Sequence, residues 1–133
     1  MTVKRIVANI ATLDAAAVRQ FYQDIFELEV AMDLGWIATL SHAHGDDAPV
    51  QLSVAREGGS GTAVPALSIE VDDLDAVMAR ATAAGVQIEN GPADEPWGVR
   101  RFYFCDPAGT LINVLAHAGS SGRVRPDDFG ELL

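Results

Sequence analysis

The chain has only one cysteine, Cys105, and no long apolar run. A single thiol excludes a disulfide within the chain and favours a reducing compartment such as the cytoplasm. No segment approaches the roughly 20 apolar residues that a transmembrane helix needs. The N-terminal MTVKRIVANIATLD also lacks the apolar core of a secretory signal. We therefore expect a cytoplasmic protein with no membrane partner.

Basic residues are scarce as well. The sequence has 9 Lys and Arg against 19 Asp and Glu, for a formal net charge of −10. Such a surface repels phosphate backbones, so nucleic acid is not an expected partner. It would attract a cationic ligand, although solubility alone also accounts for it. The length of 133 residues fits one domain with a full core.

The sequence repeats weakly at an offset of 61 residues. The tripeptide LDA at 13–15 recurs at 74–76, and Trp36 recurs as Trp97. The segment EGGSGT at 57–62 has the composition of a linker between the two copies. We expect one domain over 1–118, built from repeats 1–57 and 62–118, followed by a tail over 119–133. The tail is either loose or docked on a partner.

Each copy has the pattern of one strand, one helix and three strands. In the first, a stripe at i, i+3, i+4, i+7 predicts an amphipathic helix. It consists of Val18, Phe21, Tyr22 and Ile25. In the second, the corresponding stripe follows Asp72-Asp73 and precedes a C-capping Gly85. It consists of Leu74, Val77, Met78 and Ala81.

The segment DPAG at 106–109 fits a type I turn and predicts a hairpin over 98–115. The whole order is therefore βαβββ, twice. This order predicts an α+β fold with helices on one side of mainly antiparallel sheets.

These patterns together resemble a known family. The segments LD…FY, IEVDDLDAV…AAGV and WGVRRFYFCDPAGTLINVL are similar to those of the vicinal oxygen chelate superfamily. That group contains glyoxalases, bleomycin resistance proteins and extradiol dioxygenases. The resemblance covers about 1–118. It implies two tandem βαβββ modules that form half-barrel sheets around a cleft, often completed in a homodimer.

The resemblance also implies four positions for a divalent metal ion, on the first and last strands of each module. They are occupied here by Arg5, Leu52, Ala66 and Asn113. Arginine carries a fixed positive charge, alanine and leucine offer no donor atom, and asparagine offers one neutral oxygen. We therefore predict no cofactor at this site. A divalent metal ion is the disfavoured alternative, since a two-residue change of register would bring only Asn9 and Glu70 to the cleft. His42 and His44 lie in a loop-like segment, and His117 is expected to be capping or exposed.

The remaining polar and aromatic residues of the expected cleft suggest a small-molecule site. The predicted ligand-binding residues are Arg5, Asn9, Trp36, Leu52, Ser68, Glu70, Trp97, Arg101, Tyr103 and Asn113. Arg5 could bind a carboxylate or carbonyl group beside Asn113, or it could pair with Glu70. Glu70 and Tyr103 are the candidate catalytic residues. Cys105 has no positioned base in the sequence and is not expected to be a nucleophile.

Two functions follow from the resemblance. The first is a metal-free protein that binds an aromatic or oxygenated small molecule, as the antibiotic-sequestering members bind cationic aromatic drugs. The acidic charge and the two tryptophans favour it. The second is a lyase, isomerase or dioxygenase that acts on a small oxygenated substrate.

Overall fold

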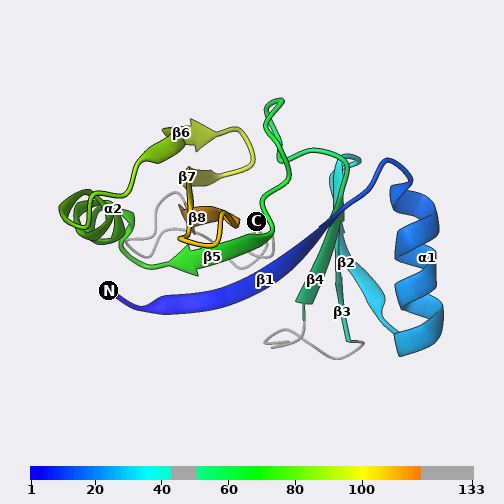
Figure 1. Ribbon diagram of the computed structural model, residues 1–133. Coiled ribbons are helices and arrows are strands. Elements are labelled where there is room, and N and C mark those ends of the chain that lie inside the picture. Colours follow the sequence, from blue (N-terminus) through cyan, green and yellow to red (C-terminus); the bar gives the residue numbers. More distant parts are fainter. Residues whose placement is uncertain (43–50, 118–133) are drawn as a thin grey trace. The chain divides into compact units, whose positions relative to one another are not determined.

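The computed structural model describes residues 1–42 and 51–117 (Figure 1). The order of elements in these residues is the expected βαβββ, twice. It runs β1 (Val3–Ala11), α1 (Ala15–Phe26), β2 (Glu29–Asp33), β3 (Ile37–Ser41), β4 (Gln51–Ala55), β5 (Leu67–Val71), α2 (Leu74–Ala83), β6 (Ile88–Glu95), β7 (Val99–Cys105) and β8 (Leu111–His117). The fold is α+β, as the sequence predicts.

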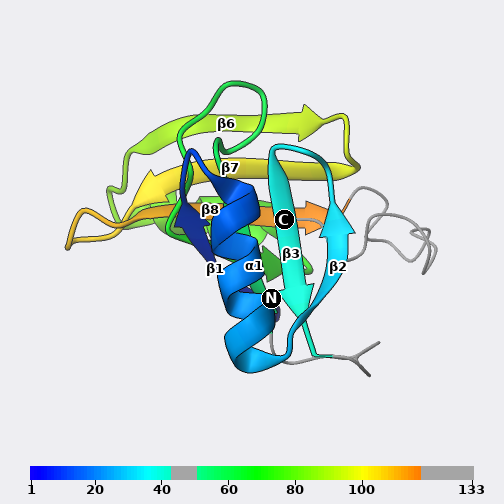
Figure 2. The same cartoon turned by 90° about the vertical axis from the view of Figure 1, so that its right-hand side faces the viewer.

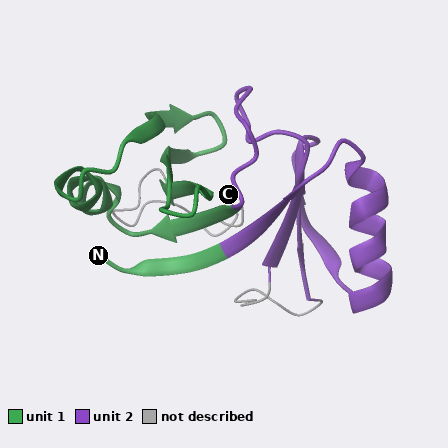
Figure 3. Ribbon diagram, in the orientation of Figure 1, with its two compact units in different colours: residues 1–6, 67–133 green, residues 7–66 purple. Residues whose placement is uncertain are grey.

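The strands of the described residues pair in the order β2-β3-β4-β1-β5-β8-β7-β6. Within each repeat the outer strands are antiparallel, whereas the first strand pairs in parallel with the last, β1 with β4 and β5 with β8. The chain forms two compact units (Figure 3). Unit 2 is 7–66, and unit 1 combines 1–6 with 67–133. The start of the first strand therefore groups with the second repeat rather than with its own.

Unit 1 has a core between α2 and one face of its sheet. Phe102 and Val114 are almost fully buried there, and Val77 and Met78 of the predicted stripe pack against them. The side chain of Asp73 caps α2 by accepting a hydrogen bond from the Ala76 N–H at 3.1 Å. The predicted hairpin is confirmed, because β7 and β8 are joined by the 106–109 turn.

Unit 2 places α1 alongside β3, as Figure 2 shows, and in contact with β4. Asp14 caps this helix through a 3.1 Å hydrogen bond from the Ala17 N–H. The predicted helix is confirmed, but its apolar stripe is not buried, since Phe21 and Ile25 are 55% and 60% exposed.

The strand register shows that the two repeats are not related by one constant offset. Ile37 lies opposite Ala55, and Val99 lies opposite His117, so the last two strands of each unit correspond with an offset of 62. The extra residue is Gly98, which follows Trp97 with φ +95° before β7 begins. A positive φ suits glycine, which has no Cβ to clash.

No helix in the described residues is both long enough and apolar enough to cross a membrane.

Candidate functional site in unit 1

The face of the unit 1 sheet opposite α2 is polar. Side chains alternate along a strand, so the neighbours of the core residues in β5, β7 and β8 point to the other face. The register aligns Ser68 with Asn113, and Asn113 with Tyr103, across three adjacent strands. This face, here called the polar face of unit 1, is largely buried, and Val99 and Leu115 also lie on it. Its polar members are Arg5, Ser68, Glu70, Arg101, Tyr103, Asn113 and His117.

Glu70 is the centre of the charged part of this face. Its side chain is 3% exposed. One carboxylate oxygen lies 2.7 Å from Arg5 Nε, an ion pair without a well-directed hydrogen bond. The other lies 2.8 Å from His117 Nδ1 and 3.8 Å from Lys4 Nζ. A carboxylate only accepts hydrogen bonds, so ionised Glu70 requires the proton of His117 to be on Nδ1.

These neighbours keep Glu70 ionised. Burial raises the pKa of this carboxyl group, since a charged group is costly to remove from water. The hydrogen bond and charge of His117, together with the charges of Arg5 and Lys4, outweigh burial and hold the pKa of Glu70 below its ordinary value. The group is therefore a buried carboxylate at neutral pH.

Asn113 lies in the middle of the face and is 1% exposed. Its Nδ2 donates to Ser68 Oγ at 3.1 Å. Its Oδ1 is buried and accepts no hydrogen bond from the part of the chain that the structure describes. A buried acceptor without a donor costs about 1–3 kcal/mol, so this oxygen is an unsatisfied group aimed at the polar face.

Arg101 forms a second cluster on β7. Its guanidinium group lies 4.9 Å from the ring centroids of both Trp97 and Tyr103. It also donates hydrogen bonds to the Glu95 carboxylate at 2.8 Å and to the Tyr103 hydroxyl at 2.9 Å. The side chain is 3% exposed, so the cation is held rigidly between an acid and two rings.

In the described residues, the corresponding face of unit 2 is polar, with Glu29 on its outer strand opposite Ser41. Asn9 lies beside Ser53, and Thr39 and Ser53 share a buried 2.9 Å hydrogen bond. By register, Asn9 and Ala55 hold the places that Glu70 and His117 hold in unit 1. The ionisable groups of the two faces are therefore concentrated in unit 1.

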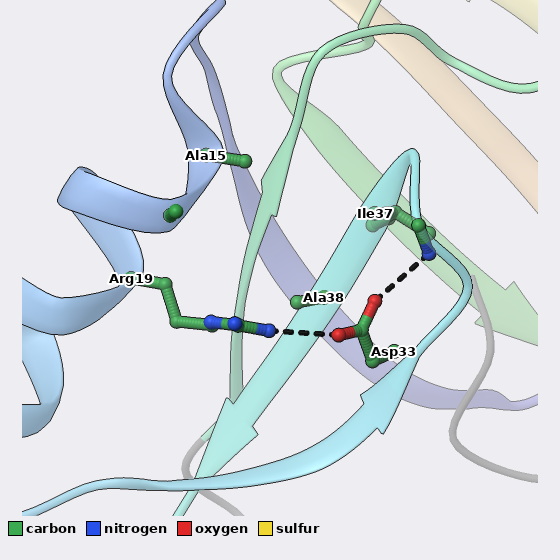
Figure 4. A pocket seen from close by; sticks show the side chains of 7 residues that line it. Ala15, Arg19, Asp33, Ile37 and Ala38 are labelled. Atoms are coloured by element: carbon green, nitrogen blue, oxygen red, sulfur yellow. Dashed lines mark hydrogen bonds and ion pairs between the residues drawn. The ribbon is translucent and has the colours of Figure 1, made fainter.

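Unit 2 also has a small pocket of about 170 Å³ between α1 and the β2–β3 turn (Figure 4). Arg19 donates a 2.8 Å hydrogen bond to the Asp33 carboxylate there, and Asp33 also accepts a hydrogen bond from the Gly35 N–H. The Gly35 hydrogen bond and Arg19 lower the pKa of Asp33. Ligand pockets usually enclose about 300–1,000 Å³, and this one is walled mainly by alanine and an existing ion pair. It is the weaker candidate.

Most of the predicted ligand-binding residues of the second repeat meet on one face. Arg5 pairs with Glu70, which was one of the two alternatives for it, and Arg101 lies on the same side as Tyr103, as predicted. Asn9, Trp36 and Leu52 belong to unit 2. His44 and the tail over 119–133 lie outside the described residues.

Two of the sequence expectations need correction. His117 is not exposed but 8% accessible and paired with Glu70. Leu52 lies on the opposite face from Asn9 and Ser53, because Leu52 is the neighbour of Ser53 on β4. By register, the counterpart of Asn113 is Gln51. The sequence signals this change of offset only through one glycine: Trp97 is followed by Gly98 and then Val99, whereas Trp36 is followed directly by Ile37.

The comparisons identify the family to which this architecture belongs. Residues 4–114 match the family described as the Glyoxalase/Bleomycin resistance protein/Dioxygenase superfamily. The chain belongs to this superfamily, as its sequence motifs indicated.

Solved structures share the fold at low identity. A structure titled as an NAD-dependent benzaldehyde dehydrogenase from Legionella pneumophila is 14% identical, with a TM-score of 0.67, over 84% of this chain and 98% of that one. A superfamily member from Vibrio splendidus 12B01 is 17% identical, with a TM-score of 0.59, over 86% and 99%. Methylmalonyl-CoA epimerase from Mycobacterium tuberculosis is 18% identical, with a TM-score of 0.56, over 92% and 91%. No curated protein matches the chain.

The residues at the four positions that the family resemblance assigns to a metal ion do not fit a divalent cation. Arg5 places a positive charge there and is already paired with Glu70. Ala66 has no donor atom, and Asn113 offers a neutral amide. Replacing Leu52 by Gln51 in the set adds only a second neutral amide. Three of the four positions thus lack the imidazole or carboxylate ligands that such an ion requires, and the fourth opposes it.

Proposed function

We propose that this protein binds an aromatic or oxygenated small molecule without a metal ion, using the polar face of unit 1. The observation that carries the proposal is the buried, unsatisfied Oδ1 of Asn113, a residue that is 1% exposed where relatives are expected to place a metal-binding carboxylate. A ligand hydroxyl or N–H that reached this oxygen would satisfy it. Arg5, Ser68 and Tyr103 supply further polar contacts.

The predicted ligand-binding residues of unit 2 remain a separate prediction for that unit alone. They are Asn9 and Trp36, with Gln51 in the place of Leu52 by strand register. The protein is proposed to act in the cytoplasm as a homodimer, in keeping with its single Cys105 and with the superfamily resemblance.

A metal analysis joined to a ligand screen tests this proposal. Purified protein is expected to carry no stoichiometric metal, and Mn²⁺, Ni²⁺ or Zn²⁺ should not raise its melting temperature. Aromatic and oxygenated compounds, cationic ones included, should raise it by mass action. The variant Asn113→Leu should lose most of that ligand-dependent rise. Stoichiometric metal, or a rise that survives in the variant, would contradict the proposal.

The second candidate is an enzyme of the lyase, isomerase or dioxygenase type. The specific observation in its favour is the buried pair of Glu70 and His117, since a carboxylate that orients an imidazole is a common arrangement for proton transfer. Tyr103 is a further candidate acid on the same face. The structural similarity to an epimerase is consistent with this alternative but shows only the fold.

A further inference from the structure

We infer that the polar face of unit 1 selects an uncharged ligand with two hydrogen-bond donors, one for the Asn113 amide oxygen and one for the Glu70 carboxylate. This inference rests on the proposed function and narrows its ligand class. Its geometric basis is that Asn113 Oδ1 and Glu70 Oε1 are both buried and accept no hydrogen bond from the residues that the structure describes. A buried acceptor without a donor destabilises the fold, and a ligand with two donors would relieve both.

The two acceptors belong to adjacent strands of one sheet. Ser68 of β5 lies opposite Asn113 of β8, and Glu70 follows Ser68 by two residues, so all three side chains share a face. Neighbouring strands lie about 4.8 Å apart and alternate residues of a strand about 6.6 Å apart, so the two positions are separated diagonally by about 8 Å. A single ring with two substituents is therefore large enough to reach both oxygen atoms.

The hydrogen bonds of both residues leave these two oxygen atoms as acceptors. Asn113 Nδ2 donates to Ser68 Oγ at 3.1 Å, so the amide nitrogen is engaged and the amide oxygen is not. Glu70 Oε2 lies 2.8 Å from His117 Nδ1, whereas Oε1 lies 2.7 Å from Arg5 Nε without a well-directed hydrogen bond. A carboxylate oxygen has two lone pairs, so Oε1 can keep its ion pair with Arg5 and accept a hydrogen bond from a ligand.

The charges around Glu70 disfavour ionic ligands. Lys4 Nζ at 3.8 Å and Arg5 Nε at 2.7 Å place two positive charges beside one carboxylate, and a cationic ligand would be repelled by this surplus. A carboxylate or phenolate group offers only lone pairs, and here it would face two further acceptors. Hydroxyl, amide and aromatic amine groups donate without carrying a charge. The expected ligands are therefore neutral molecules with two such groups.

Probes built on one benzene ring test this class. The compound meta-aminobenzyl alcohol is uncharged at neutral pH and has two donor groups, and its fully methylated form, meta-(methoxymethyl)-N,N-dimethylaniline, has none. Titration of the full-length protein, followed by NMR shifts of its backbone amides, gives the affinities. The alcohol should bind about a hundredfold more tightly than the fully methylated form, at about tenfold for each buried hydrogen bond. The charged analogues meta-(hydroxymethyl)benzylammonium and meta-(hydroxymethyl)benzoate should both bind more weakly than the alcohol.

Variants assign each donor to its acceptor. Asn113→Leu removes one acceptor and Glu70→Met the other, so each should lower the affinity for meta-aminobenzyl alcohol by about tenfold. In each variant, methylation of the ligand group that met the lost acceptor should cost no further affinity, whereas methylation of the other group should keep its full cost. Glu70→Gln keeps an oxygen atom at this position and provides a second test should Glu70→Met unfold. Glu89→Met makes the same change at an exposed glutamate and should leave binding unchanged.

The inference is overturned if meta-aminobenzyl alcohol does not bind, if the fully methylated form or a charged analogue binds as tightly, or if methylation costs the same in the native protein and both variants. These results differ from failure of the proposed function. Binding of ionic or fully methylated compounds that Asn113→Leu abolishes would uphold small-molecule binding on this face while removing the requirement for two neutral donors.

Discussion

At the scale of single residues, Glu70 links the stability of unit 1 to pH. Its pKa is lowered in the folded state, so its stabilising effect is present above the ordinary glutamate pKa and is lost as pH falls through the folded value. Removing it also takes away the carboxylate that forms an ion pair with Arg5. The part of the polar face around Lys4 and Arg5 thus depends on the Glu70 carboxylate for its charge balance.

We expect Glu70→Ala to reduce the free energy of unfolding by about 3 kcal/mol at neutral pH, the usual cost of breaking a buried ion pair. The loss should shrink as pH falls below about 4.3, where an ordinary glutamate protonates. Urea unfolding at several pH values measures both effects. The exposed Glu89→Ala is the control and should change little. An equal loss at every pH would show that the charge of Glu70 contributes nothing.

A substitution at Asn113 is expected to affect ligand binding much more than the free energy of unfolding. Asn113→Leu removes a buried oxygen that has no donor in the described residues, so the free energy of unfolding should stay within about 1 kcal/mol of the native value or rise. The stabilisation by ligands from the thermal screen should fall at the same time. A variant that is strongly destabilised would mean that the amide serves packing rather than ligand binding.

At the scale of elements, β6 approaches β7 closely at one glycine. Gly91 has φ +80°, and a Cβ there would lie 2.7 Å from the carbonyl oxygen of Arg101. Gly109, in the β7–β8 turn, has φ +84° but open space around it. The two positions therefore differ in crowding and not in backbone conformation.

Gly91→Ala should consequently destabilise the protein more than Gly109→Ala. Both substitutions carry a left-handed backbone cost of about 1–2 kcal/mol, and only Gly91→Ala adds a clash with backbone. Thermal or urea unfolding of both variants checks the order. Weakening of the Arg101 cluster should follow in Gly91→Ala, visible as a change in Trp97 fluorescence. Equal destabilisation of the two variants would mean that β6 can shift away from the Arg101 carbonyl oxygen at no cost in free energy.

Elements were predictable because their signals are local. The Asp14 and Asp73 caps, the stripe of α2 and the 106–109 turn all lie within a few residues of the structure they determine. The exposure of Phe21 and Ile25 on α1 was not predictable, since burial depends on what lies beneath the helix.

At the scale of the whole molecule, we expect a homodimer. The superfamily resemblance implies it, and Phe21, Ile25 and Phe26 of α1 leave apolar surface exposed on the single chain. Sedimentation should give a mass twice the chain mass of 14.1 kDa. A single-chain mass across the concentration range of the binding assays would contradict this expectation.

The sequence by itself determined the doubled βαβββ order and the family, and it supplies the identities of Arg5, Ala66 and Asn113 at positions that the resemblance assigns to a metal ion. Those conclusions need only residue identities and local spacing. The tertiary structure alone decided that Gln51 rather than Leu52 corresponds to Asn113, and that His117 meets Glu70 across 47 residues of sequence. The reason is strand register. Side chains alternate between the two faces of a sheet, and Gly98 is one additional residue in the second repeat. Residues after Gly98 that are aligned at an offset of 61 therefore lie on opposite faces of their sheets.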